Sequence, residues 1–175
     1  VLHSEIRDGS LRAVAQEEGV PILLYEAGEA LRFDETSIRI GVHGIVNVLR
    51  ENNMLPKVLR KKPPKTPIIT KSSQWIRASE SGMLRTIKAL GDTVQKDEII
   101  AFIDEPLDDE FFEIKASFDG IIIGKSEIPL VQAGDAIFHI ARFTDLEMAV
   151  HKIEYFSEGA IEKSEFHEMN NEESI

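Results

Sequence analysis

The sequence predicts a chain of two structural classes, an α/β segment over residues 1–55 followed by an all-β module over residues 68–143. In the first part a short apolar run lies between two helical patterns, which is typical of an α/β fold. The second part contains an internal repeat of β-rich runs, which indicates a small sandwich or barrel with pseudo-twofold symmetry. A stretch rich in proline and basic residues, 56–67, is predicted to be an extended linker between them. Residues 144–175 are expected to form an acidic tail that is partly helical or disordered.

The first element expected is a short helix over residues 9–19. Ser10 is a suitable N-cap, and Gly19 suits the left-handed position that ends many helices. One apolar stripe follows the helical period and consists of Leu11, Val14 and Ala15.

The second element expected is a strand, Val20–Tyr25, because a short apolar run bounded by turn residues is typical of a strand buried on both faces. Glu26 follows directly, and Ala27 and Gly28 then let the backbone turn. Burying an unpaired carboxylate is costly, and the carboxyl ends of strands are where open α/β sheets place their ligand crevice. Two interpretations stay open at this point: Glu26 works in such a crevice, or it faces water or caps the next helix.

The third element expected is a helix from about Glu35 to Asn53, with Asp34 as its N-cap. Its apolar positions recur at three- and four-residue steps and are Ile38, Val42, Ile45 and Leu49. Gly41 and Gly44 each cost such a helix roughly 1 kcal/mol relative to alanine, so a close contact with the sheet is expected there. A segment of this size with one strand cannot complete its own core. We therefore expect the rest of the sheet to come from outside this chain, or the segment to pack differently.

The repeat in the second part is visible in two pairs of segments. Residues 94–103 align with residues 131–140, and residues 81–84 align with residues 119–122 with a one-residue difference in length. Two copies of one β unit predict a fold in which the copies are related by an approximate twofold axis.

Composition excludes several functional classes. The formal net charge of -11 argues against nonspecific binding to nucleic acid. There is no cysteine, so the chain has no disulfide and no thiolate metal ligand, which fits a cytoplasmic protein. No apolar run approaches the roughly 20 residues that span a bilayer, so no membrane partner is expected. The chain has no initiator methionine and its first residues do not form a signal peptide, so we expect it to be part of a longer protein.

Three motifs carry a resemblance to a known family, namely Asp8-Gly9-Ser10-Leu11-Arg12, Glu26-Ala27-Gly28-Glu29-Ala30-Leu31-Arg32-Phe33-Asp34 and Gly41-Val42-His43-Gly44-Ile45-Val46-Asn47-Val48-Leu49-Arg50. Together they resemble the succinylglutamate desuccinylase/aspartoacylase family, zinc-dependent deacylases built on the carboxypeptidase plan. The resemblance covers about residues 1–142 and implies that the chain is the C-terminal portion of such an enzyme. The β module resembles the barrel-sandwich hybrid of biotinyl and lipoyl domains, and the family carries a similar module.

The resemblance implies a function and roles for three residues. The family hydrolyses the amide bond of N-acyl amino acids, using Zn²⁺ to polarise the carbonyl and to supply hydroxide. Glu26 matches the carboxylate that takes the proton of the water and passes it to the leaving amine. Arg12 and Arg32 are the candidates for binding the carboxylate of the substrate, and an exposed helix arginine is the alternative for each.

The zinc ligands that the resemblance implies are not expected in this chain. The family supplies them from a His-x-x-Glu motif and a later His, both before the catalytic Glu. Here only His151 has a Glu three residues later, Glu154, and both lie on the wrong side of Glu26. His3 matches a different Leu-His-Ser segment and is expected to be a packed or site-lining residue. The fragment alone is therefore expected to bind no catalytic zinc and to hydrolyse nothing.

The β module has two other possible functions. Carrier domains attach their group to a lysine at the hairpin between the repeats, but residues 104–113 contain no lysine, which argues against a carrier. A non-catalytic binding or assembly protein built on the β module stays open as the alternative function. The sequence leaves the oligomeric state, including a homo-oligomer, undecided.

Overall fold

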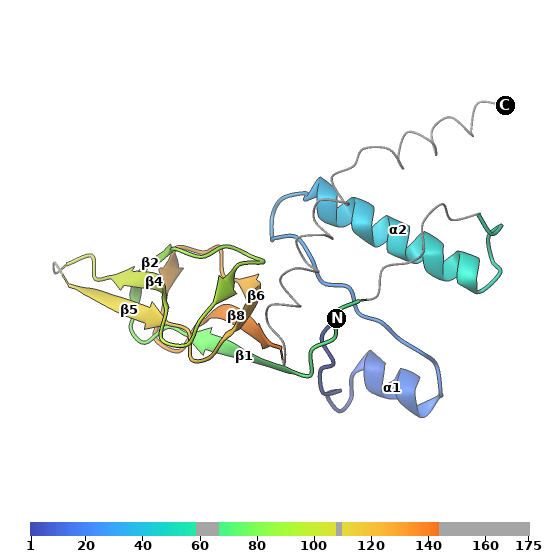
Figure 1. Ribbon diagram of the computed structural model, residues 1–175, viewed down its shortest axis with the longest axis horizontal. Helices are drawn as coiled ribbons and strands as arrows, with labels where there is room; N and C mark the ends of the chain where they lie inside the picture. Colours follow the sequence, from blue (N-terminus) through green and yellow to red (C-terminus); the bar gives the residue numbers. More distant parts are fainter. Residues whose placement is uncertain (59–66, 108–109, 144–175) are drawn as a thin grey trace. The chain divides into compact units, whose positions relative to one another are not determined.

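The computed structural model describes residues 1–58, 67–107 and 110–143 (Figure 1). The chain divides into two compact units, which are treated separately below. The helical unit comprises the described residues of Glu5–Thr66. The β module comprises Val1–Ser4 together with the described residues from Pro67 onward. Most of the predicted linker and the whole predicted acidic tail, with His151 and Glu154, lie outside the described residues.

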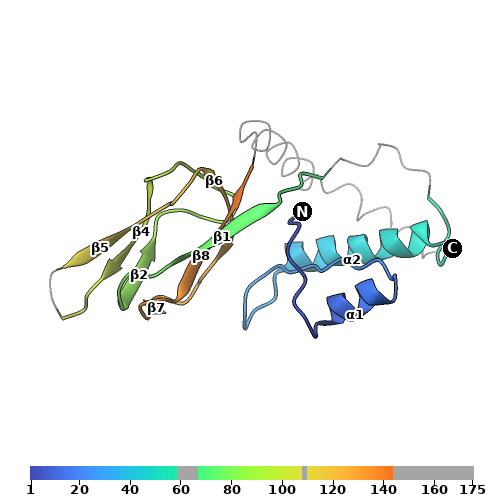
Figure 2. The ribbon, with the colours of Figure 1, turned by 90° about the horizontal axis from the view of Figure 1, so that it is seen from below.

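The first helix of the helical unit, α1, spans Leu11–Glu17 and agrees with the prediction (Figure 2). The Ser10 hydroxyl accepts a hydrogen bond from the Ala13 N–H at 3.2 Å, which caps the helix. At the other end Gly19 has a φ of 68°, and its N–H donates to the carbonyl of Gln16 at 3.1 Å. The next N–H, that of Val20, donates to the carbonyl of Ala15 at 2.7 Å, which completes a Schellman motif.

The second helix, α2, spans Glu35–Glu51 and also agrees with the prediction. The Asp34 carboxylate accepts a hydrogen bond from the Ser37 N–H at 2.9 Å. The helix ends with Asn53 in the left-handed region at a φ of 57°. The Met54 N–H donates to the carbonyl of Leu49 at 2.9 Å. Neither α1 nor α2 has a buried residue, so within this unit the apolar stripe of α2 stays open to solvent.

The prediction of a buried strand at 20–25 is wrong for this chain. These residues form no strand, and their side chains are exposed, Leu23 at 86% and Leu24 at 60%. A strand is a ladder of hydrogen bonds, and nothing in the described part of the chain pairs with this segment. The close contact expected at Gly41 is present, but its partner is Tyr25 of this segment and not a sheet. A Cβ on Gly44 meets nothing within 4 Å, so no such contact exists there.

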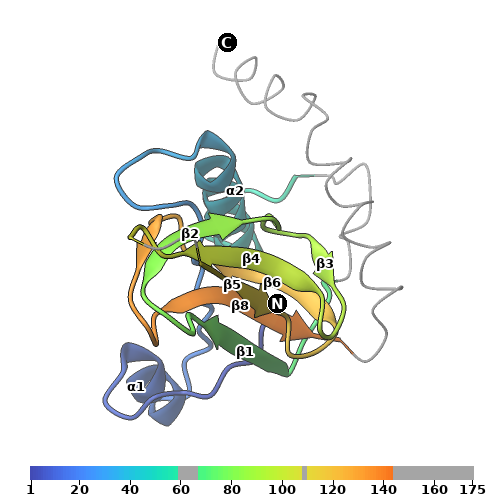
Figure 3. The same cartoon turned by 90° about the vertical axis from the view of Figure 1, so that its left-hand side faces the viewer.

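The β module contains two four-stranded antiparallel sheets (Figure 3). One has the order β1-β8-β6-β3 and the other the order β5-β4-β2-β7. The strands are β1 Ser72–Arg77, β2 Gly82–Thr86, β3 Thr93–Val94, β4 Ile99–Asp104, β5 Phe111–Lys115, β6 Gly120–Lys125, β7 Leu130–Val131 and β8 Ala136–Arg142. The sheets are separate, so these strands close no barrel, and the likeness to biotinyl and lipoyl domains stays a prediction.

The predicted internal repeat is confirmed by the strand pairing. If β1 to β4 are replaced by β5 to β8 and the reverse, the order of one sheet becomes the order of the other. The two copies also exchange their short strands, because β3 of the first pairs with β6 of the second and β7 of the second pairs with β2 of the first. Each sheet is therefore built from both copies, so neither copy forms its sheet alone.

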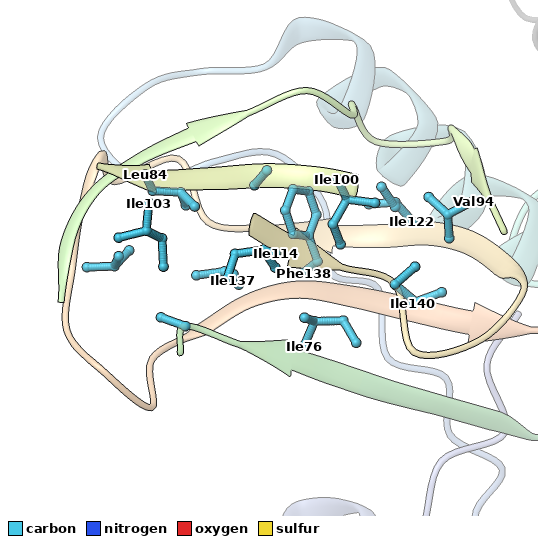
Figure 4. Packing of buried hydrophobic residues seen from close by; sticks show 14 of the residues in the cluster. Ile76, Leu84, Val94, Ile100, Ile103, Ile114, Ile122, Ile137, Phe138 and Ile140 are labelled. Carbon is cyan, nitrogen blue, oxygen red and sulfur yellow. The ribbon is translucent and has the colours of Figure 1, made fainter. Parts of the chain in front are cut away.

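The core of the β module lies between the two sheets (Figure 4). Its largest fully buried side chain is Phe138 of β8. Every strand contributes to this cluster, among others through Ile76, Leu84, Val94, Ile100, Ile114, Ile122, Val131 and Ile140. The central strands do not alternate strictly, because consecutive residues such as Ile137 and Phe138 of β8 are both buried in this cluster.

The first residues of the chain contact the β module. Leu2 forms a parallel bridge with Thr70, and the His3 N–H donates to the carbonyl of Thr70 at 2.8 Å. The Thr70 N–H donates to the carbonyl of Val1 at 2.9 Å. Thr70 is only 5% exposed, and its hydroxyl hydrogen-bonds the carbonyl of Arg142 at 2.5 Å. The segment before the helical unit is thus attached next to the start of β1.

Candidate functional site

The candidate site is the loop of residues 26–33, hereafter the Glu26 loop, which connects the Tyr25 segment to α2. Both ends of the loop are attached to one residue of the first turn of α2, Ser37. The Tyr25 hydroxyl donates to the Ser37 carbonyl at 2.9 Å. The Ser37 N–H donates to the carboxylate of Asp34 at 2.9 Å. A loop whose two ends meet at one helical turn is held in place even though its side chains are exposed.

The charge of Asp34 strengthens its hydrogen bond with the Ser37 N–H at the N-terminus of α2. Hydrogen bonds from Ser37, first from its backbone N–H and then from its side chain, lower the pKa of Asp34 from its ordinary value. The carboxylate is therefore ionised at neutral pH. A negative charge at the N-terminus of a helix also interacts favourably with the helix dipole.

Within the loop the backbone turns twice through the left-handed region. Gly28 has a φ of 82°, and a Cβ added to it would lie 3.5 Å from the Cβ of Asp34. Leu31 has a φ of 64°, which is uncommon for a residue other than glycine. Across the second turn Glu29 Oε1 and Arg32 Nε form an ion pair at 3.0 Å. The loop is therefore held at its ends by α2 and bridged internally by one ion pair.

The structure places the three predicted site residues in two elements. Glu26 and Arg32 are exposed and share the Glu26 loop, whereas Arg12 is half-buried on α1. The guanidinium of Arg32 is already paired with Glu29. Glu26 does not follow a strand in this chain, because residues 20–25 form none, and its side chain is exposed. No contact of this structure tests its catalytic role.

The described residues do not fit a zinc site. Over residues 1–58, 67–107 and 110–143 no group of three or more His, Cys, Asp or Glu side chains is arranged to hold a metal ion. His3 is exposed and belongs to the segment beside Thr70.

A second cluster, of polar and aromatic groups, lies on the outer face of the sheet β1-β8-β6-β3. The rings of Trp75 and His139 are stacked, with centroids 4.6 Å apart and planes 10° apart. His139 Nε2 and Ser73 Oγ are 2.9 Å apart. A Cβ on Gly124 would lie 3.0 Å from His139 Cβ and 3.5 Å from Trp75 Cη2, so the glycine makes room for the stack. We interpret this cluster as packing on the sheet surface.

Sequence reasoning missed Tyr25 and Ser37, the two residues that hold the Glu26 loop through a side-chain and a backbone contact. In the sequence Tyr25 ends the apolar run that predicts a buried strand. The available signal was Gly41, because a glycine inside a helix requires a reason and the contact with the Tyr25 ring is that reason.

Similar proteins were found by comparison with solved structures. No protein-family model and no curated protein sequence matches the chain. The ectoine utilization protein EutE (DoeB) of Ruegeria pomeroyi, solved with product bound, superposes with a TM-score of 0.70 at 19% identity, covering 81% of this chain and 44% of that chain. A succinylglutamate desuccinylase of Silicibacter sp. gives a TM-score of 0.69 at 19% identity, with coverage of 81% and 44%. An aspartoacylase family protein of Mesorhizobium loti gives 0.57 at 17% identity, with coverage of 82% and 43%.

The chain has the fold of the succinylglutamate desuccinylase/aspartoacylase structures. The resemblance predicted from the three motifs is thereby confirmed at the level of fold. The chain spans less than half the length of these solved structures. In the described part of the chain no helix combines the length and the apolar character needed to cross a membrane.

Proposed function

We propose that the protein carrying this chain is a deacylase that hydrolyses the amide bond of N-acyl amino acids and that Glu26 is its proton-transfer group. The observation that carries the proposal is the fold shared with a desuccinylase structure over 81% of the chain and with an aspartoacylase family structure over 82%. The exposed carboxylate of Glu26, in a loop attached at both ends to α2, supports it further. A positioned carboxylate can take a proton from the attacking water and return it to the leaving amine.

The proposal includes Zn²⁺ as the cofactor, with ligands outside the 175 residues of this chain. The described residues contain no group of three or more suitable ligands, which supports zinc ligands elsewhere in the protein. We also propose that the β module is a barrel-sandwich hybrid like those of biotinyl and lipoyl domains, and that the protein works in the cytoplasm on a small-molecule substrate.

Arg12 and Arg32 are proposed to bind the substrate carboxylate. A guanidinium and a carboxylate form two parallel hydrogen bonds, which suits recognition of an amino acid end. Of the two, Arg32 shares the loop with Glu26 but is paired with Glu29. Substrate binding at Arg32 therefore requires the substrate carboxylate to compete with Glu29 or to join it on the other edge of the guanidinium.

The test is Glu26→Gln in the protein that carries this chain, assayed on a panel of N-acyl amino acids. Loss of the proton-transfer group is expected to lower kcat by roughly 10²- to 10⁴-fold, with the zinc content unchanged. Glu35→Gln is the matched control, because it removes an exposed carboxylate just outside the loop, at the start of α2. Near-normal turnover of the Glu26 variant would remove Glu26 from the mechanism. A parent protein without turnover or zinc would favour the binding or assembly protein instead.

A further inference from the structure

The Tyr25 side chain joins the residue before Glu26 to the face of a helix. Its hydroxyl donates to the Ser37 carbonyl at 2.9 Å, and its ring lies on Gly41, one helical turn further along. A Cβ on Gly41 would be 3.0 Å from Cε1 and 3.4 Å from Cδ1 of the ring. The ring thus lies against α2 at Gly41, and a Cβ there would require the ring to shift by a few tenths of an ångström.

This contact has no counterpart at the second glycine of α2. A Cβ on Gly44 meets nothing within 4 Å. Both glycines lower the stability of the helix by similar amounts, but only Gly41 gains a packing contact in return. The Tyr25 ring therefore contacts α2 at Gly41 and not at Gly44, and its hydroxyl hydrogen-bonds the Ser37 carbonyl.

We propose that Tyr25 is a positioning residue that fixes the place of Glu26 relative to α2 by seating its ring on Gly41 and its hydroxyl on Ser37. Because Glu26 directly follows Tyr25, its backbone is attached to the helix through one residue. Asp34 holds the other end of the Glu26 loop on the Ser37 N–H. The inference rests on the proposed function of Glu26, and it extends that function to residues that carry no acid–base chemistry of their own.

The reason for such an arrangement is geometric. A general base acts only within hydrogen-bond reach of the proton that it removes, so small displacements cost rate. A misplacement of about 1 Å can lower the rate on the order of a hundredfold. The Glu26 side chain is exposed, so its positioning depends largely on its backbone.

The test compares Gly41→Ala with Gly44→Ala in the protein that carries this chain. Both substitutions raise helix propensity equally, but only the first places a methyl group against the Tyr25 ring. Gly41→Ala is expected to lower kcat by roughly threefold to tenfold with little change in KM, although the helix itself is no less stable. Gly44→Ala is expected to leave kcat within about twofold. Tyr25→Phe keeps the ring and loses one hydrogen bond, so kcat is expected to fall by roughly three- to tenfold.

Hydrogen exchange gives a readout that does not depend on turnover. In Tyr25→Phe and Gly41→Ala, peptides covering residues 26–34 are expected to exchange faster, and in Gly44→Ala they are expected to match the parent. Equal kcat and exchange in the Gly41 and Gly44 variants would overturn the inference. If Glu26→Gln keeps normal turnover, the proposed function fails; if that variant is inactive while Tyr25→Phe and Gly41→Ala are unaffected, only the positioning role fails.

Discussion

The β module and the helical unit come from one chain but are stabilised in different ways. In the β module every strand contributes to one core, and six of its core residues, Ile100, Ala101, Ile103, Ile137, Phe138 and Ile140, have 0% exposure. In the helical unit neither helix has a buried residue, and Ile45 in the middle of α2 is 63% exposed. The helices are instead defined by their caps and by the contact of Tyr25 with α2.

This difference shows that helices can be well formed in a segment that has no buried core. Caps and helical period act within a few residues, so they give α1 and α2 their bounds without any core. A core requires two apolar surfaces that face each other, which the internal repeat supplies in the β module. The apolar stripe of α2 has no such partner among the described residues of the helical unit.

The largest effect expected from this comparison is that of Phe138→Ala. Removing a fully buried aromatic ring leaves a cavity between the two sheets and is expected to lower the free energy of unfolding by about 3–5 kcal/mol. Chemical denaturation followed by fluorescence measures it, because Trp75, the only tryptophan of the chain, lies in β1. Ile45→Ala on α2 is the matched control and is expected to change this transition by less than about 0.5 kcal/mol. Similar losses for both variants would contradict the difference between the units.

A smaller loss of stability is expected when Gly82 or Gly120 of the β module is substituted. A Cβ on Gly82 would lie 2.5 Å from the carbonyl oxygen of Asp104, and one on Gly120 would lie 2.4 Å from that of Ala141. These glycines occupy equivalent places in the two copies, so Gly82→Ala and Gly120→Ala are each expected to destabilise the β module by about 1–3 kcal/mol. Thermal unfolding of each variant measures this. A much larger loss at one glycine than at the other would show that the copies are not energetically equivalent.

The smallest effect expected is a dependence on pH. The side chain of Lys88 and then the Gln95 N–H hydrogen-bond Glu98 and lower its pKa in the folded state. A group with a lowered folded pKa stabilises the fold above its unfolded pKa, so this contribution is lost as the pH falls below about 4.3. Glu98→Gln is expected to flatten the acid side of the melting curve against pH, measured from pH 7 to pH 3. Asp135→Asn alters the equivalent turn, where the Gln132 N–H donates to Asp135 at 2.8 Å, and is the control. An unchanged pH dependence in Glu98→Gln would contradict the assignment.

Prediction from sequence succeeded where the forces are local or repeated. Ser10, Gly19 and Asp34 have the cap roles that their side chains and backbone freedom predict. The two copies of the β unit were visible because the same turn and apolar positions recur, and the pairing of β2 with β4 and of β6 with β8 follows that recurrence. Of the site, the expected turn at Gly28 is present, with a φ of 82°, whereas the role of Glu26, which rests on a motif, stays a prediction.

Prediction failed where the outcome depends on distant partners. Residues 20–25 have the composition of a buried strand, but a strand exists only when a neighbour accepts and donates its backbone hydrogen bonds. In this chain Tyr25 contacts α2 instead, at a distance of 12 residues along the sequence from Ser37. No spacing rule in the sequence distinguishes Gly41, which receives the ring, from Gly44, which does not.

The sequence by itself determined the helix ends, the duplicated β unit and the candidate carboxylate, because capping, periodicity and motif identity depend on neighbouring residues. Only the tertiary structure decided that the two copies exchange strands to build each sheet. It alone also decided that Tyr25 rests on Gly41 and that both ends of the Glu26 loop meet at Ser37. These contacts join residues far apart in the chain, so they depend on which surfaces meet when the whole chain folds.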